Sequence, residues 1–117
     1  MDRVYISGPI SYVRSAMMNF DKAQFALESR GYDVFNPFAI RMPDTEEEKK
    51  EYNKIGEWAW FMRRCISELA KCDAILMLPD WMSSRGARVE RDLADDLKLT
   101  IYENLDEVKD INELRES

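Results

Sequence analysis

The chain has 117 residues, 45% of them hydrophobic and 34% charged, with a formal net charge of −6 at pH 7. The negative charge argues against a broad surface for a nucleic acid polymer, because such surfaces depend on clustered positive charge. The absence of histidine excludes Ser-His and Cys-His catalysis and histidine-ligated metals, which leaves Asp, Glu, Tyr, Cys and Lys for acid–base chemistry.

Hydrophobic periodicity and turn residues predict strands that alternate with helices along the whole chain. The expected order is strand 4–6, helix 16–29, strand 32–35, helix 53–71, strand 73–78, helix 85–98, strand 99–102 and helix 105–114. Gly31 is placed to end the first helix as its C′ residue. In the helix 53–71, the apolar stripe contains Ile55, Trp58 and Met62, whereas Trp60 lies outside it. We expect the 117 residues to form one domain.

Residues 38–52 interrupt this alternation with a turn at Met42-Pro43-Asp44 and a charged run over residues 46–51. This segment is either a solvated short helix or surface loop, or a lid over a site at the strand ends.

Strands that alternate with helices predict an α/β fold: three layers, with a flavodoxin/Rossmann-like parallel sheet of four to five strands and helices on both faces. Such sheets bind ligands at the carboxyl ends of their strands. That edge would bring together three short segments, namely Ser7-Gly8-Pro9, Asn36-Pro37 and residues 79–86.

The helix 85–98 carries the most informative residue of the chain. Glu90 falls on its inward stripe with Ala87 and Ala94, where an apolar side chain is expected. One turn earlier, the free N–H groups of the helix start, a serine cap at position 83 or 84, and Gly86 suit a bound anion, and Arg85 adds positive charge. Either Glu90 merely pairs with an arginine, or it is a reactive carboxylate in a site.

Two aromatic residues are candidates for the same site. Tyr5 in the first strand either packs or faces the site. Trp81, in the loop after the third strand, either stacks on a nucleobase or serves packing or an oligomer contact.

The sequence predicts a cytoplasmic protein that needs neither metal nor cofactor. Its two cysteines are too few and wrongly spaced for a zinc site, and we expect buried thiols in a reducing compartment. No apolar run reaches the ~18 residues of a membrane helix, and the N-terminus enters a strand directly, so no signal peptide is expected.

The segments together resemble the nucleoside 2-deoxyribosyltransferase-like superfamily, most of all its small phage and bacterial branch of unassigned function. The resemblance covers about residues 3–102. It rests on motifs at residues 4–9, 31–34, 36–37, 72–75 and 78–81, on Phe20 and Leu27, and on Ser84-Arg85-Gly86-Ala87-Arg88-Val89-Glu90.

The resemblance implies a chemistry. In characterised relatives, a glutamate on the helix after the third strand attacks the anomeric carbon of a 2′-deoxyribosyl group, and Glu90 matches this nucleophile. Tyr5 matches the tyrosine that orients it. Ser84 matches a serine that holds the 5′-phosphate in the related deoxynucleoside 5′-monophosphate N-glycosidase, whereas the transferases have an acidic residue there.

One position departs from the relatives, which carry an acidic aspartate eight residues before the aspartate that opens the third strand. Here Asp73 opens that strand and Cys65 stands at the acid's position. A thiol is a poor acid for protonating a nucleobase. Glu57, Glu68 or Asp80 could replace the missing acid.

Three hypotheses follow. The first is an N-glycosidase or deoxyribosyltransferase-like enzyme acting on a (deoxy)nucleoside 5′-monophosphate through Glu90. The second is a non-catalytic nucleotide-binding module that has lost the acid. The third is a structural protein whose aromatic surface forms an oligomer. The resemblance also implies a homo-oligomer, a dimer or tetramer. The expected site residues are Tyr5, Ser7, Gly8, Pro9, Asn36, Trp81, Ser84, Arg85, Gly86 and Glu90.

Overall fold

The computed structural model of the chain describes residues 2–10 and 14–116, with side chains through residue 113. Its centre is a sheet of four parallel strands in the order β2-β1-β3-β4. The strands are β1 (Arg3–Ser7), β2 (Asp33–Phe35), β3 (Ala74–Met77) and β4 (Thr100–Tyr102). The predicted α/β fold with a parallel sheet of four to five strands is therefore confirmed, with four strands in the described part of the chain.

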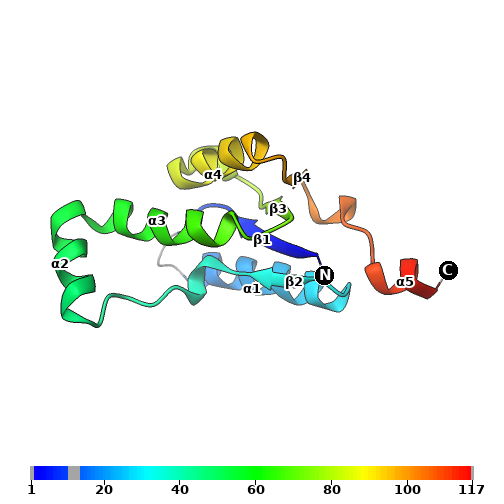
Figure 1. Cartoon of the computed structure of the whole chain (residues 1–117). Coiled ribbons are helices and arrows are strands. Elements are labelled where there is room, and N and C mark those ends of the chain that lie inside the picture. The colour runs from blue at the N-terminus through cyan, green and yellow to red at the C-terminus, as the bar shows by residue number, and fades with distance from the viewer. Residues whose placement is uncertain (1, 11–13, 117) are drawn as a thin grey trace.

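Helices cover both faces of this sheet (Figure 1). They are α1 (Arg14–Ser29), α2 (Glu46–Ile55), α3 (Glu57–Leu69), α4 (Arg85–Asp96) and α5 (Ile111–Glu116). Helix α1 packs on one face, and α3 and α4 pack on the other (Figure 1). Because the chain leaves β1 towards β2 on one side and then returns to β3 on the other, the switch in strand order lies between β1 and β3.

The alternation of side chains along β1 assigns residues to the two faces. Val4 and Ile6 join the core under α1, whereas Tyr5 joins the core under α3 and α4. Ser7 lies two residues after Tyr5 and is also fully buried. Two successive odd-numbered positions of β1 therefore carry hydroxyl groups into the layer between the sheet and α4.

The predicted helix 53–71 is wrong in its start, because the structure has two helices that meet at Gly56. Helix α2 begins at a capping box in which Thr45 and Glu48 bond each other's backbone N–H groups. Gly56 has φ of 89°, a conformation that costs glycine little, and its N–H donates to the carbonyl of Tyr52. The capping box thus starts a helix inside the segment 38–52, and the glycine ends it.

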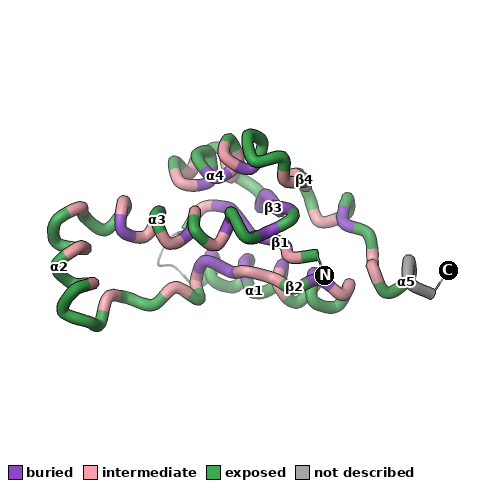
Figure 2. The backbone as a smooth tube through the Cα atoms, in the orientation of Figure 1, coloured by how far each residue is buried: buried purple, intermediate pink, exposed green. Residues whose placement is uncertain are grey.

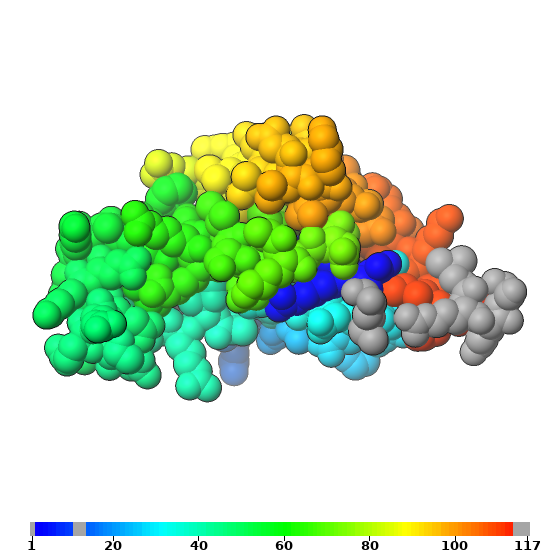
Figure 3. Space-filling view, in the orientation of Figure 1, coloured from blue at the N-terminus to red at the C-terminus, as the bar shows by residue number. Residues whose placement is uncertain are grey.

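Helix α2 extends beyond the sheet and contains no buried residue (Figure 2). It forms one end of an elongated molecule with principal extents of 52 × 26 × 25 Å (Figure 3). The rings of Tyr52 and Trp60 in α3 meet edge to face, with their centroids 5.7 Å apart. The guanidinium carbon of Arg64 lies 3.5 Å from the centroid of the same indole. Arg64 also pairs with Glu48 and Glu51 of α2. One aromatic residue and one arginine of α3 therefore hold α2.

The predicted helix 105–114 is also wrong, since the structure has a short 3₁₀ turn at Leu105–Glu107 and then α5. Between them Val108 is buried, and the Tyr32 hydroxyl donates to the carbonyl of Lys109 at 2.8 Å. The N–H of Ile111 donates to the carbonyl of Arg30. These long-range bonds replace the helical hydrogen bonds that local pattern alone would favour.

Within the described ranges, no helix combines the length and the apolar character that crossing a membrane requires.

Candidate functional site

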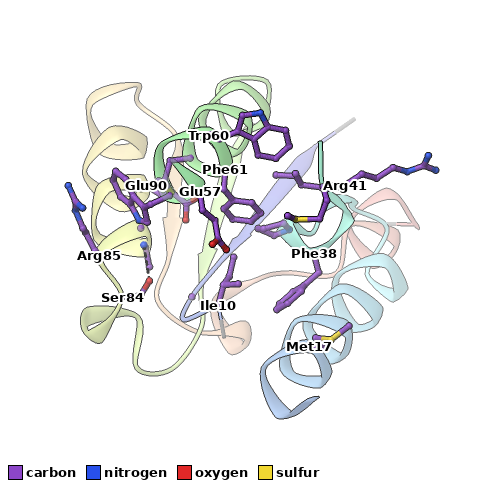
Figure 4. Close-up of a pocket in the computed structure, with 18 residues that line it drawn as sticks. Ile10, Met17, Phe38, Arg41, Glu57, Trp60, Phe61, Ser84, Arg85 and Glu90 are labelled. Atoms are coloured by element: carbon purple, nitrogen blue, oxygen red, sulfur yellow. Dashed lines mark hydrogen bonds between the residues drawn. The ribbon is translucent and has the colours of Figure 1, made fainter. Parts of the chain in front are cut away.

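A cavity of about 700 Å³ opens at the carboxyl ends of β1, β2 and β3 (Figure 4). Its walls come from the segments after β1 and β2 and from the beginnings of α1, α3 and α4. The lining residues include Gly8, Ile10, Met17, Phe38, Arg41, Glu57, Trp58, Phe61, Met62, Ser84, Arg85, Gly86 and Glu90. The cavity therefore lies where ligands bind in open parallel sheets.

Glu90 is a buried carboxylate at the wall of this cavity, with a side chain only 4% exposed. The Tyr5 hydroxyl donates a hydrogen bond to its Oε2, and the Ser7 hydroxyl donates to its Oε1 at 2.7 Å. The two donors come from the same face of β1, whereas Glu90 comes from α4. The two hydroxyls hold both carboxylate oxygens in a defined orientation.

The surroundings of Glu90 change its acidity. Burial raises the pKa of Glu90 to about 7, because the charged form loses hydration, while the hydrogen bonds from Tyr5 and Ser7 lower it in part. Burial and the nearby charge of Glu90 raise the pKa of Tyr5 far above its usual value, so Tyr5 stays a hydrogen-bond donor at neutral pH. Near pH 7 the site thus holds a poorly solvated carboxyl group close to half ionisation, and its charged form accepts hydrogen bonds from both hydroxyls.

The start of α4 offers donors for an anion beside Glu90. Ser84 is the N-cap, and its Oγ accepts from the Ala87 N–H at 3.2 Å. The N–H groups of Arg85 and Gly86 find no hydrogen-bond partner in the described part of the chain. A Cβ on Gly86 would meet Met62 Sδ at 3.1 Å, so the glycine also permits α3 and α4 to approach closely.

Cationic and aromatic side chains complete the walls. The guanidinium carbon of Arg85 lies 3.8 Å from the centroid of the Trp58 indole. This contact links the start of α4 to the start of α3. Arg41 lines the opposite side with its guanidinium directed away from the cavity, and Phe38 and Phe61 add apolar surface (Figure 4). This combination of charge and flat rings can accept a ligand that has both an anionic group and an aromatic ring.

The structure places half of the expected site residues on the lining of the cavity. Gly8, Ser84, Arg85, Gly86 and Glu90 line it. Tyr5 and Ser7 lie behind Glu90 and reach the cavity through their hydrogen bonds to it.

Besides Tyr5 and Ser7, three expected residues are not among those that line the cavity, and they make no contact with Glu90 that the structure shows. Pro9 is half-buried in the loop after β1. The buried Asn36 accepts from the Phe38 N–H and donates to Gln24, so it holds the loop after β2. Trp81 packs against the core under α3 and α4, where Arg91 stands over its ring at 4.9 Å.

The expectation for the two tryptophans of α3 is reversed. Both tryptophans line the cavity, but Trp58 is 41% exposed, whereas Trp60 is 1% exposed. Trp58 belongs to the first turn of α3, beyond the edge of the sheet, while Tyr52 and Arg64 enclose Trp60. Contacts with α2, which begins earlier than predicted, account for the reversal.

Cys65, at the position of the relatives' acid, is fully buried in the core under α3 and α4 and is not among the lining residues. Burial and the charge of Glu90 raise the pKa of this thiol to about 12, while Tyr5 lowers it in part. Of the three replacements considered, Glu68 pairs with Arg3 at 3.2 Å and lines no part of this cavity. Asp80 lies in an exposed left-handed turn outside it, whereas Glu57 lines it.

Sequence reasoning missed the cavity walls formed by the segments after β1 and β2 and by the beginning of α1. Phe38, Ile40 and Arg41 line the cavity from the segment after β2, and Ile10 and Met17 line it from the segment after β1. Of these, only the residues that directly follow Asn36-Pro37 could have been expected from their position at a strand end. Over the described residues, no three side chains of the metal-binding types gather into a possible metal site.

A family model described as "Domain of unknown function (DUF4406)" matches residues 2–103. Among solved structures, the chain is similar to the 2-deoxyribosyltransferase of the psychrotolerant bacterium Bacillus psychrosaccharolyticus, a biocatalyst for the industrial synthesis of antiviral and antitumoral nucleosides. The TM-score is 0.64 at 17% identity, over 85% of this chain and 69% of that chain. At this identity the similarity shows a shared fold. No curated protein matches the chain.

Proposed function

The chain belongs to the DUF4406 family of unknown function, and we propose that it is an N-glycosidase or deoxyribosyltransferase-like enzyme acting on a (deoxy)nucleoside 5′-monophosphate. The observation that carries this proposal is the buried Glu90, held at the cavity wall by hydroxyls from Tyr5 and Ser7. A structural ion pair would bring a cation to Glu90, and none of the ion pairs found among the described residues includes it.

The chemistry proceeds in two displacements with net retention. A carboxylate oxygen of Glu90 forms a bond to C1′ of the sugar as the C1′–N bond breaks, and its electron pair leaves with the base. Water, or a second base, then forms a bond to C1′ as the ester to Glu90 breaks and the carboxylate is restored. Tyr5 and Ser7 keep the attacking carboxylate oriented throughout.

The start of α4 supplies the binding site for the 5′-phosphate in this proposal. The N–H groups of Arg85 and Gly86, the hydroxyl of Ser84 and the helix dipole all favour an anion. The guanidinium of Arg85 adds a fixed charge, because it is already stacked on Trp58. Trp58 and Phe61 offer flat apolar surface for the nucleobase.

The direct test is release of free base from deoxynucleoside 5′-monophosphates, followed by chromatography. We expect release by the wild-type protein, and loss of about 10⁴-fold or more in Glu90→Gln, because the nucleophile is removed. Arg91→Gln, which changes a charge on α4 outside the cavity lining, serves as the matched control. Absence of release by the wild type, together with nucleotide binding that Glu90→Ala leaves unchanged, would contradict an enzymatic function.

A non-catalytic nucleotide-binding module is the second candidate, and the burial of Cys65 favours it. With the thiol outside the cavity lining, the acid of the relatives has no counterpart at that position. This candidate predicts that monophosphates raise the melting temperature without being consumed. Turnover of any monophosphate excludes it, and absence of any thermal shift excludes both candidates.

The preference for a monophosphate over a nucleoside is tested at Ser84. Placing a negative charge there in Ser84→Asp would repel the phosphate, so we expect kcat/KM to fall for the monophosphate and to change little for the nucleoside. A second base added as acceptor separates hydrolysis from transfer, because only transfer yields a new nucleotide. A homo-oligomer and a cytoplasmic location stay predictions, and analytical ultracentrifugation tests the former.

A further inference from the structure

The second displacement requires a group that takes a proton from water, and the cavity contains few side chains that can do so. The guanidinium groups of Arg41 and Arg85 offer donors and no acceptor, and Cys65 is not among the lining residues. Tyr5 is already a donor to Glu90. Among the lining residues that the structure describes, Glu57 and Glu90 are the two carboxylates, and Glu90 holds the sugar at this step.

Glu57 is positioned by the break between α2 and α3. It is the first residue of α3, directly after Gly56 with its φ of 89°. Figure 4 shows its carboxylate pointing into the cavity that Glu90 borders from α4. The stack of Arg85 on the next residue, Trp58, joins the starts of α3 and α4. The two carboxylates therefore enter one cavity from two helices whose starts are held together.

The surroundings of the two carboxylates differ in the way that two roles require. Glu90 is buried, as suits a poorly solvated nucleophile. Glu57 is exposed to solvent in the first turn of a 13-residue helix, so water can reach its carboxylate. A carboxylate that water can reach is placed to take the proton of an attacking water and pass it to solvent, which favours the role of base.

We propose that Glu57 is the general base that activates water in the second displacement, a role that rests on the function proposed above. As the water oxygen forms its bond to C1′, the ester bond to Glu90 breaks and its electron pair returns to the Glu90 carboxylate. The water proton goes to Glu57, which releases it to solvent through the open cavity. The nucleobase that left in the first displacement takes its proton from solvent.

The test separates the two displacements in Glu57→Gln. We expect one equivalent of base to be released at the wild-type rate, and then steady-state turnover slower by about 10²–10⁴-fold. Intact-protein mass spectrometry should find the glycosyl ester on Glu90, and Glu90→Gln should prevent its formation. Azide needs no base to attack C1′, so its addition should restore turnover and yield the glycosyl azide.

Glu47→Gln is the matched control, because it removes the same charge from the first turn of α2, outside the cavity lining. If wild-type protein releases base and Glu57→Gln turns over equally fast, the role of Glu57 is overturned and the proposed function stands. Loss of the first equivalent in a folded Glu57→Gln protein also overturns it, because Glu57 would then act in the first displacement. If the wild type releases no base, both proposals fail.

Discussion

The two faces of the sheet differ in what they bury. The face under α1 is covered by apolar side chains such as Phe20 and Leu27, against Val4 and Ile6 of β1. The face under α3 and α4 has an equally apolar centre, but at the carboxyl ends of its strands it encloses the carboxylate of Glu90. The first face contributes stability, whereas the second gives up stability to hold a buried carboxylate.

The largest effect should come from the face under α1. Leu27 is fully buried there, so Leu27→Ala should lower the free energy of unfolding by about 2–5 kcal/mol. Phe25→Ala on the same helix is the control, because Phe25 is 75% exposed and its loss should change stability by about 0.5 kcal/mol or less. Urea unfolding followed by circular dichroism measures both. Equal effects would contradict the assignment of this core.

On the other face, removing a side-chain charge should stabilise the protein. The pKa of Glu90 is raised to about 7 in the fold, because burial disfavours its charged form. The free energy of unfolding that this burial costs therefore increases as the pH rises from about 4.5 to 7. We expect Glu90→Gln to be more stable than the wild type by about 3 kcal/mol above pH 7 and equally stable near pH 4. Thermal unfolding at several pH values measures the difference. A gain that does not depend on pH would contradict a raised pKa of Glu90.

A smaller effect concerns the pH dependence of base release. The hydrogen bond from Tyr5 lowers the pKa of Glu90, and Tyr5→Phe removes this bond while keeping the ring that stacks on Phe35 at 5.5 Å. Release should rise with pH through about 7 in the wild type, and the midpoint should move up by about one to two pH units in Tyr5→Phe. Ser7→Ala should act in the same direction. An unchanged midpoint in both variants would show that the observed pKa belongs to another group.

The smallest expected change in stability is at the start of α4. Ser84→Ala removes the N-cap bond to the Ala87 N–H and should cost about 1 kcal/mol. It should also weaken binding of a monophosphate more than binding of the corresponding nucleoside, as isothermal titration calorimetry can show. Asn104→Ala, which removes the cap of the 3₁₀ turn after β4, is the control that should leave both affinities unchanged.

Local pattern was sufficient for the strands and for α4. The apolar run before Pro79 predicted β3, and the helical spacing of Ala87, Glu90 and Ala94 predicted the inward side of α4, on which all three are buried. It was not sufficient for the segment 38–56. There the capping box at Thr45 and the positive φ of Gly56 divide one apparent helix into two, and apolar spacing continues across such a break without a sign of it.

The sequence by itself determined the alternation of strands and helices, the inward position of Glu90 and the anion-favouring start of α4, because these depend on residues within a few turns of one another. Tertiary structure decided the rest. Tyr5 and Ser7 reach Glu90 from 85 and 83 positions away, through the parallel pairing of β1 with β3 and the packing of α4 on that sheet. The same packing buries Cys65, leaves Trp58 at the cavity and directs Glu57 into it. These contacts depend on which helix packs against which strand or helix. Hydrophobic periodicity shows which side of an element is buried, but not which element covers it.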